Sequence, residues 1–221
     1  MEQGWYSLLF AHWPMAKSHV RMLVPPELEL DTFQNEAWVS ITAFHVRMRP
    51  RGLFALGKFW SFPELNCRTY VRYRGLPGIY FYSLDAGSLL AVSGARMFYR
   101  LPYFRAKMTC LKGRSEVDYR SQRTSLAASF VARYKPVSPR RLAEFGTLEH
   151  WLIERYCLFT VAGTKVWRAD IHHQPWLLQT ATAGISSNTV AAAAGLSLGG
   201  APTLVGYAEQ QEVLVWPLRK Q

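Results

Sequence analysis

Cysteine is scarce in this 221-residue chain, and its distribution excludes two common frameworks. The three cysteines, Cys67, Cys110 and Cys157, are odd in number and far apart in the sequence. A disulfide-stabilised small domain needs an even, closely spaced set, and a zinc site needs clustered cysteine and histidine ligands. The sequence therefore predicts neither framework, and it suits a reducing compartment.

Targeting signals and long apolar runs are also missing. Met1 is followed by Glu2 and an aromatic segment, without the basic stretch and apolar core of a secretory signal. The longest uncharged tract, residues 171–208, contains histidines and many serines, threonines and glycines, so it is too polar for a membrane-spanning helix. We expect a cytoplasmic protein without membrane contact.

Acidic residues are few, with 15 Asp and Glu against 26 Lys and Arg, which gives a net charge of +11. A positive field favours an anionic partner. Arginine outnumbers lysine 19 to 7, and the guanidinium fork suits bidentate binding of carboxylate or phosphate. The basic residues are scattered, with no run of five or six, so a small anionic metabolite is favoured over nucleic acid.

Several sequence motifs of catalysis are absent or out of context. No phosphate loop or dinucleotide fingerprint is found. Residues 195–199 (GLSLG) match the nucleophile elbow of hydrolases, but a predicted helix precedes this serine where the elbow requires a strand. The adjacent His172 and His173 would point to opposite faces of a strand, and no ligand spacing connects them to other histidines. No metal and no cofactor are predicted.

Short strands joined by tight turns dominate the remaining sequence. Residues 37–44 have strand composition and alternation, and further short strands are predicted at residues 95–99, 104–111, 116–123 and 126–134. Helices are predicted at residues 16–23, after Thr147 as N-cap, and from Ser187 or Asn188 to Gly195. The predicted fold is α+β and mainly antiparallel β: one domain, residues 1–221, with a sheet that curls toward a barrel and a few short helices.

Residues 62–85 form the central predicted hairpin, with its turn at residues 75–78 (GLPG). Because side chains alternate along a strand, the first arm has a polar face and an apolar or small face. The polar face carries Glu64, Asn66, Arg68, Tyr70 and Arg72, and the other carries Leu65, Cys67, Thr69 and Val71. Alternation alone leaves open whether the polar face lines a pocket or is an exposed ladder of ion pairs.

Several specific motifs are spread over nearly the whole chain: residues 62–71 (FPELNCRTYV), 78–85 (GIYFYSLD), 95–96 (AR), 101–103 (LPY), 154–158 (ERYCL) and 172–176 (HHQPW), with 11–14 (AHWP) and 213–216 (VLVW). In these motifs the chain resembles the YqjF-like family of uncharacterised bacterial proteins. That family is similar to acetoacetate decarboxylase. The resemblance implies a curved, mostly antiparallel sheet that closes over a cavity, usually in a homo-oligomer.

The same resemblance bears on catalysis. Acetoacetate decarboxylase works through a Schiff-base lysine, in a lysine pair that directly follows Phe-Pro. The counterpart here is residues 101–104 (LPYF), so Tyr103 and Phe104 stand where the lysines would. Lys107 is the nearest lysine, and an odd slip along a strand reverses the face on which a side chain lies. The resemblance therefore supports the fold and an anion-accepting cavity, and it counts against decarboxylation by the known route.

The leading hypothesis is a protein that binds a small carboxylated or oxo metabolite, with enzymatic activity left open. Its cavity would be lined by Glu64, Asn66, Arg68, Arg96 and Tyr103. Arg68 or Arg96 would hold the anion, Glu64 would orient the guanidinium or act as acid or base, and Tyr103 would donate a hydrogen bond. One alternative is a lysine-dependent lyase that uses Lys107, with Glu64 as the other catalytic candidate. Another is a non-enzymatic basic module for an anionic partner.

Overall fold

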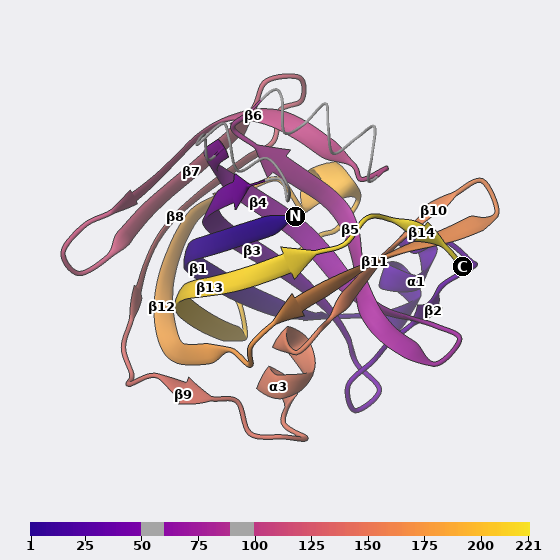
Figure 1. Cartoon of the computed structure of the whole chain (residues 1–221). Helices are drawn as coiled ribbons and strands as arrows, with labels where there is room; N and C mark the ends of the chain where they lie inside the picture. Colours follow the sequence, from indigo (N-terminus) through magenta and orange to yellow (C-terminus); the bar gives the residue numbers. More distant parts are fainter. Residues whose placement is uncertain (50–59, 89–99) are drawn as a thin grey trace.

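The computed structural model describes residues 1–49, 60–88 and 100–221. Strands dominate this part of the chain, and its helices are short (Figure 1). In sequence order the elements are β1 (Glu2–Met15), α1 (Lys17–Leu23), β2 (Glu29–Leu30), β3 (Ala37–Arg49), β4 (Trp60–Tyr73), β5 (Leu76–Ala86), β6 (Tyr103–Lys112), β7 (Val117–Arg123), β8 (Ser129–Pro136), β9 (Arg141–Leu142), α3 (Leu148–Ile153), β10 (Cys157–Ala162), β11 (Lys165–His173), β12 (Leu177–Asn188), the 3-10 turn η2 (Ala192–Ala194), β13 (Leu204–Val215) and β14 (Arg219–Lys220). Among the described helices, none has the length and apolar character needed to cross a membrane.

Five neighbouring strands, β13, β1, β3, β4 and β5, form a continuous antiparallel wall. The first strand and the last long strand, β1 and β13, lie side by side (Figure 1). Across the wall, Phe10 of β1 pairs with Thr42 of β3, and Thr42 pairs with Asn66 of β4. Because paired residues lie directly opposite each other on neighbouring strands, residues far apart in sequence form rows on each face of the wall.

The wall closes on itself in two ways. From β5 the pairing continues in parallel to β6 and then antiparallel to β7, β8, β12 and back to β13, a hydrogen-bonded ring through nine strands. A second connection runs from β5 in parallel to β10, then to β11 and again to β13. The predicted curved and mainly antiparallel sheet is confirmed.

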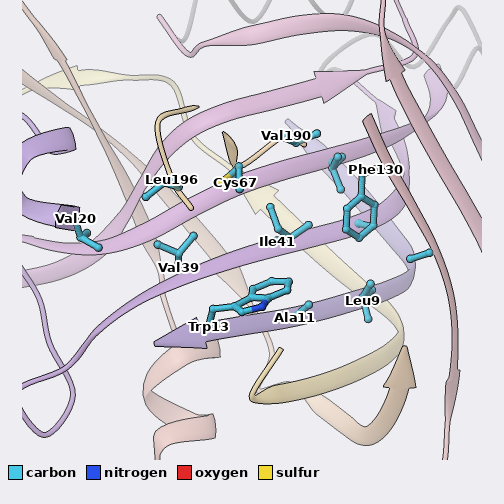
Figure 2. Packing of buried hydrophobic residues seen from close by; sticks show 14 of the residues in the cluster. Leu9, Ala11, Trp13, Val20, Val39, Ile41, Cys67, Phe130, Val190 and Leu196 are labelled. Carbon is cyan, nitrogen blue, oxygen red and sulfur yellow. The ribbon is translucent and has the colours of Figure 1, made fainter. Parts of the chain in front are cut away.

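Each face of the wall packs against a different hydrophobic cluster. Leu65, Cys67 and Val71 of β4 join a cluster with Tyr119 of β7 and Phe130 of β8. Figure 2 shows part of this packing, with Leu9, Ile41, Cys67 and Phe130 gathered between the strands. The opposite face contributes, among others, Phe62, Tyr70 and Phe81 to a second cluster that includes Leu158 of β10 and Ile171 of β11. The period-two alternation predicted for residues 64–71 therefore separates the two clusters.

The turn of the central hairpin differs from the prediction. The sequence placed it at residues 75–78, but Leu76 already pairs with Tyr73, and the turn consists of Arg74 and Gly75. Both turn residues have positive φ, 49° and 77°. Two-residue hairpin loops with positive φ at both positions match the right-handed twist of the flanking strands. The tight turn thus extends β5 toward its amino end, through Pro77 and Gly78.

The predicted helices are only partly confirmed. Helix α1 forms, and α3 begins after Thr147, whose side chain accepts a hydrogen bond from the backbone N–H of His150. The predicted helix ending at Gly195 is reduced to the 3-10 turn η2, and Asn188 is the last residue of β12 instead of a cap. The strand pairing of β12 with β8 runs through Asn188, which pairs with Phe130 and therefore does not begin a helix. The predicted strand at residues 95–99 lies outside the described residues.

Candidate functional site

The face of the wall that carries Phe62 and Tyr70 borders a cavity of about 250 Å³. This volume lies just below the range of about 300–1,000 Å³ that is typical of sites for drug-sized ligands. Most of the lining is apolar, including Trp5, Phe10, Phe44, Phe62, Phe81 and Leu84. The polar residues of the lining are Gln3, Thr42, Glu64, Asn66, Arg68 and Tyr103.

Four of the five residues predicted to bind a ligand lie together in this cavity. Alternation along β4 turns Glu64, Asn66 and Arg68 toward it, and Tyr103 reaches it from the first residue of β6. Arg96 lies outside the described residues. This part of the polar face is therefore enclosed: Glu64, Asn66 and Arg68 are 8%, 4% and 8% exposed. Arg72, at the far end of the same face, is 42% exposed and pairs with Asp31.

Arg68 is buried without a counterion among the residues that the structure describes. Its side chain forms no hydrogen bond or ion pair with another described residue, and its Nε is buried without a partner. The guanidinium carbon lies 5.8 Å from the ring centre of Phe10. A buried charge that lacks a partner carries a large desolvation cost, which an anion bound from solution would offset.

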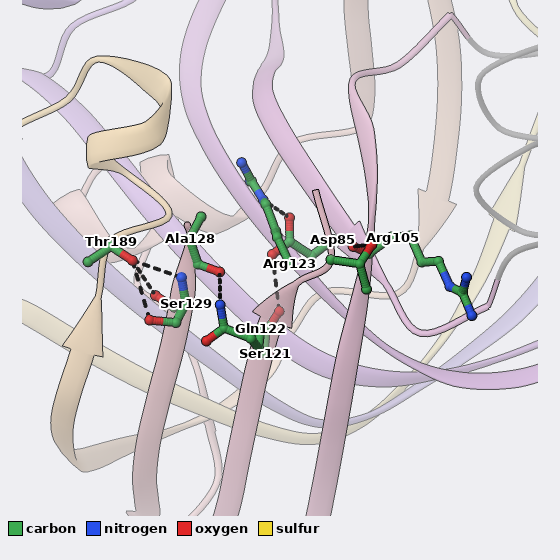
Figure 3. Close-up of polar contacts among 9 residues, drawn as sticks. Asp85, Arg105, Ser121, Gln122, Arg123, Ala128, Ser129 and Thr189 are labelled. Atoms are coloured by element: carbon green, nitrogen blue, oxygen red, sulfur yellow. Dashed lines mark hydrogen bonds and ion pairs between the residues drawn. The ribbon is translucent and has the colours of Figure 1, made fainter. Parts of the chain in front are cut away.

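The other buried arginines in the described part of the chain do have counterions. On the opposite face of the wall, the Nε of Arg123 donates to Asp85 at 2.7 Å, and Figure 3 shows this pair with Ser121 beside it. Arg155 donates to Asp31 at 2.7 Å from the loop after α3. Arg68 therefore differs from Arg123 and Arg155 in leaving its charge available to the cavity.

Glu64 is the acidic group of the cavity. The hydroxyl of Tyr103 donates to Glu64 Oε2 at 3.0 Å, and the hydroxyl of Tyr119 donates to the backbone oxygen of Glu64 at 2.7 Å. Burial raises the pKa of this carboxyl to about 7, although the hydrogen bond from Tyr103 acts in the opposite direction. Near neutral pH the carboxyl can therefore either donate or accept a proton.

Thr42 and Asn66 face one another across β3 and β4 and line the cavity beside Arg68. The Oγ1 of Thr42 and the Oδ1 of Asn66 are buried, and neither has a hydrogen-bond partner in the described part of the chain. Buried polar atoms in folded proteins are almost always paired with protein or water. This part of the lining is thus prepared to form hydrogen bonds with a bound molecule.

A buried row next to Arg68 was not predicted as part of the site. His12, which faces Ser40 across β1 and β3, forms a 2.6 Å hydrogen bond through Nδ1 to the Ser40 hydroxyl. The same hydroxyl lies 2.6 Å from the hydroxyl of Tyr70. Burial, and then the charge of Arg68, lower the pKa of His12 to about 3, so the imidazole is neutral at physiological pH. His12 consequently adds no second positive charge beside Arg68.

Lys107, the catalytic candidate of the lyase alternative, does not line this cavity. Alternation along β6 buries Ala106, and Lys107 on the other face is exposed. Among the described residues that line the cavity there is no lysine. Within the same described ranges, no group of three or more His, Cys, Asp or Glu residues could hold a metal ion.

Comparison with protein families places the chain among uncharacterised relatives. The model of the DUF2071 family, described as an uncharacterized conserved protein, matches residues 2–212. The uncharacterized protein YqjF of Bacillus subtilis (strain 168) is 50% identical over 222 residues, which cover 100% of this chain and 92% of that protein. This chain belongs to the DUF2071 family. The resemblance to YqjF-like proteins found in the sequence is thereby confirmed.

Solved structures similar to this DUF2071 member have the acetoacetate decarboxylase-like fold. Acetoacetate decarboxylase from Legionella pneumophila subsp. pneumophila str. Philadelphia 1 aligns with a TM-score of 0.65 and 14% identity over 99% of this chain and 87% of its own. The enduracididine biosynthesis enzyme MppR, complexed with pyruvate, aligns with a TM-score of 0.68 and 10% identity over 99% and 89%. At such low identity the likeness shows the fold alone, and it confirms the fold predicted from the sequence.

Proposed function

We propose that this protein binds a small carboxylated or oxo metabolite in the cavity, with Arg68 as the anchor for the anion. The supporting observation is the contrast among buried arginines: Arg123 and Arg155 are paired with aspartates, whereas Arg68 faces the cavity and has no counterion within the described ranges. A guanidinium binds a carboxylate through two parallel hydrogen bonds, which makes an acid the matching ligand.

The remaining polar residues of the cavity would orient the ligand. Glu64 would accept or donate a proton at a second oxygen of the ligand, since its pKa of about 7 permits both near neutrality. Tyr103, already bonded to Glu64, would hold that carboxyl in place. Asn66 lies between Glu64 and Arg68 on the same face of β4 and would contact the middle of the ligand. The role of Arg96 and a homo-oligomeric state stay predictions.

The fold gives limited additional support. A protein of the same fold, MppR, has been solved in complex with pyruvate, which is a small 2-oxo acid. The lyase alternative receives no such support, because Lys107 is exposed on β6 and absent from the cavity lining. The basic-module alternative is weakened because several surface arginines are paired, for example Arg120 and Arg133 with Asp118.

The test compares Arg68→Met with Arg105→Met, since Arg105 is exposed on β6 and does not line the cavity. Binding of a panel of small carboxylic and 2-oxo acids, pyruvate and acetoacetate included, would be measured by calorimetry. We expect Arg68→Met to abolish binding and Arg105→Met to retain it. Without ligand, Arg68→Met should unfold at the same or a higher temperature than wild type, because it removes an unpaired buried charge.

Two results would contradict the proposal. The first is equal binding of the acids by wild type, Arg68→Met and Glu64→Gln. The second is a large loss of stability in ligand-free Arg68→Met, which would mean that Arg68 serves the fold instead of a ligand.

A further inference from the structure

Three neighbouring polar side chains of the cavity, Thr42, Asn66 and Arg68, form what we call the polar triplet. Thr42 pairs with Asn66 across β3 and β4, and Arg68 is the next residue on the same face of β4. Each contributes a buried atom that has no hydrogen-bond partner among the described residues: Thr42 Oγ1, Asn66 Oδ1 and Arg68 Nε. Such a concentration of unpaired buried atoms in one place indicates the chemistry of the ligand that would pair them.

A carboxylate alone cannot provide a hydrogen-bond partner for every unpaired atom of the polar triplet. Arg68 only donates hydrogen bonds, whereas the hydroxyl of Thr42 and the amide of Asn66 both donate and accept. A carboxylate only accepts, so it can pair the donors of the triplet but not the acceptor of the amide. A ligand that pairs the whole triplet must carry a hydrogen-bond donor next to its carboxylate. A hydroxyl meets this need, whereas an ammonium would be repelled by the charge of Arg68.

The rest of the cavity calls for an apolar body on the same molecule. Aromatic rings from three strands of the wall line it: Trp5 and Phe10 from β1, Phe44 from β3, and Phe62 from β4. Phe81 of β5, which pairs with Arg68 of β4, completes this set. A ligand as small as lactate would leave these rings without contact, although apolar burial is a main source of binding energy.

We infer, on the basis of the proposed function, that the cavity takes a 2-hydroxy acid with an aromatic or branched apolar body. Its carboxylate binds Arg68, its 2-hydroxyl lies between Thr42 and Asn66, and its body packs among the aromatic rings of β1, β3 and β4. This inference narrows the ligand of the proposed function from any small carboxylated or oxo metabolite to one chemical class of acid.

The first experiment uses only the wild-type protein, so its result does not depend on whether a variant folds. Calorimetric dissociation constants would be measured for 3-phenyllactate, for lactate, which lacks the ring, and for 3-phenylpropanoate, which lacks the hydroxyl. We expect 3-phenyllactate to bind about ten-fold more tightly than lactate because of ring burial. We also expect it to bind about ten-fold more tightly than 3-phenylpropanoate, which leaves the amide and hydroxyl of the triplet unpaired.

A second experiment compares two variants to test whether Thr42 causes the preference for a ligand with a 2-hydroxyl. Thr42→Val should reduce the difference between 3-phenyllactate and 3-phenylpropanoate, whereas Thr109→Val, at an exposed position of β6, should leave it unchanged. If lactate or 3-phenylpropanoate binds as tightly as 3-phenyllactate and binding still requires Arg68, the inference is wrong and the proposed function stands. If none of the three acids and none of the panel bind, both are wrong.

Discussion

The hydroxyl of Tyr103 donates a 3.0 Å hydrogen bond to Oε2 of Glu64, which connects the first residue of β6 to the polar face of β4. Two effects on the pKa of Glu64 oppose each other. Burial raises the pKa of Glu64 to about 7, and the hydrogen bond from Tyr103 favours its ionised form. Glu64 therefore changes its charge within the physiological pH range, inside the proposed binding cavity.

This shift makes stability depend on pH. The pKa of Glu64 is about 7 in the folded protein against an ordinary value of 4.5, so the folded state keeps the proton to a higher pH than the unfolded chain does. Glu64 therefore contributes most to the free energy of unfolding below pH 4.5. This contribution is lost as the pH rises through 7, and the total loss is about 3 kcal/mol. Glu64→Gln stays neutral and escapes this loss. Urea unfolding across that window should show the variant gaining on wild type as pH rises, and a constant difference would contradict the prediction.

Removing the Tyr103 hydroxyl should raise the pKa of Glu64 further. Tyr103→Phe deletes the hydrogen bond that stabilises the ionised carboxylate, so the midpoint of the Glu64-dependent stability change moves to higher pH. The matched control is Tyr156→Phe, which removes a hydroxyl bonded to the half-buried carboxylate of Glu154, outside the cavity. That control should leave the midpoint in place. An unchanged midpoint in Tyr103→Phe would show that the hydrogen bond has no effect on the charge of Glu64.

The side chains that share a face of β4 could be predicted from sequence, but their enclosure could not. Alternation is a property of any strand, and it correctly grouped Glu64, Asn66 and Arg68. Whether that group faces water depends on the closure of the sheet. The closure is made by parallel pairings of β5 with β6 and with β10, which no local turn signals. Family resemblance, rather than residue pattern, supplied the cavity.

The row of His12, Ser40 and Tyr70 illustrates a second limit. These residues belong to three strands, and they meet only because of the register between β1, β3 and β4. Strand composition gives no register for partners so far apart. A local rule failed in a similar way at Asn188, where pairing of β12 with β8 prevailed over the sequence signal for a helix cap.

The buried pair Arg123–Asp85 should be a major support of the fold. Both side chains are at most 1% exposed, and the guanidinium also lies 4.1 Å from the ring centre of Phe104. Arg123→Met leaves an unpaired buried carboxylate, so we expect a loss of about 3–5 kcal/mol in the free energy of unfolding. Replacing both partners, as in Arg123→Met with Asp85→Leu, should restore part of that loss.

The control for this pair is Arg120→Met. Arg120 lies on the same strand, but its side chain is 57% exposed and pairs with Asp118 at the surface. Its removal should lower the free energy of unfolding far less than the removal of Arg123, because water screens an exposed ion pair. Equal costs for Arg120→Met and Arg123→Met in urea unfolding would show that burial of the Asp85 pair does not matter to stability.

Gly78 is expected to be required where β5 meets β10. A Cβ at this position would lie 2.7 Å from Cε2 of Phe159 and 2.8 Å from Sγ of Cys157, both nearly or fully buried. Side chains in a packed core cannot withdraw freely, so Gly78→Ala should lower the free energy of unfolding by about 1–3 kcal/mol. Gly199→Ala provides the comparison, because a Cβ there meets no atom within 4 Å.

Ile79, the residue after Gly78, lines the cavity. Gly78→Ala should therefore also weaken acid binding, whereas Gly199→Ala should alter neither stability nor binding. Equal thermal stability of the two alanine variants would refute the close packing of β5 against β10.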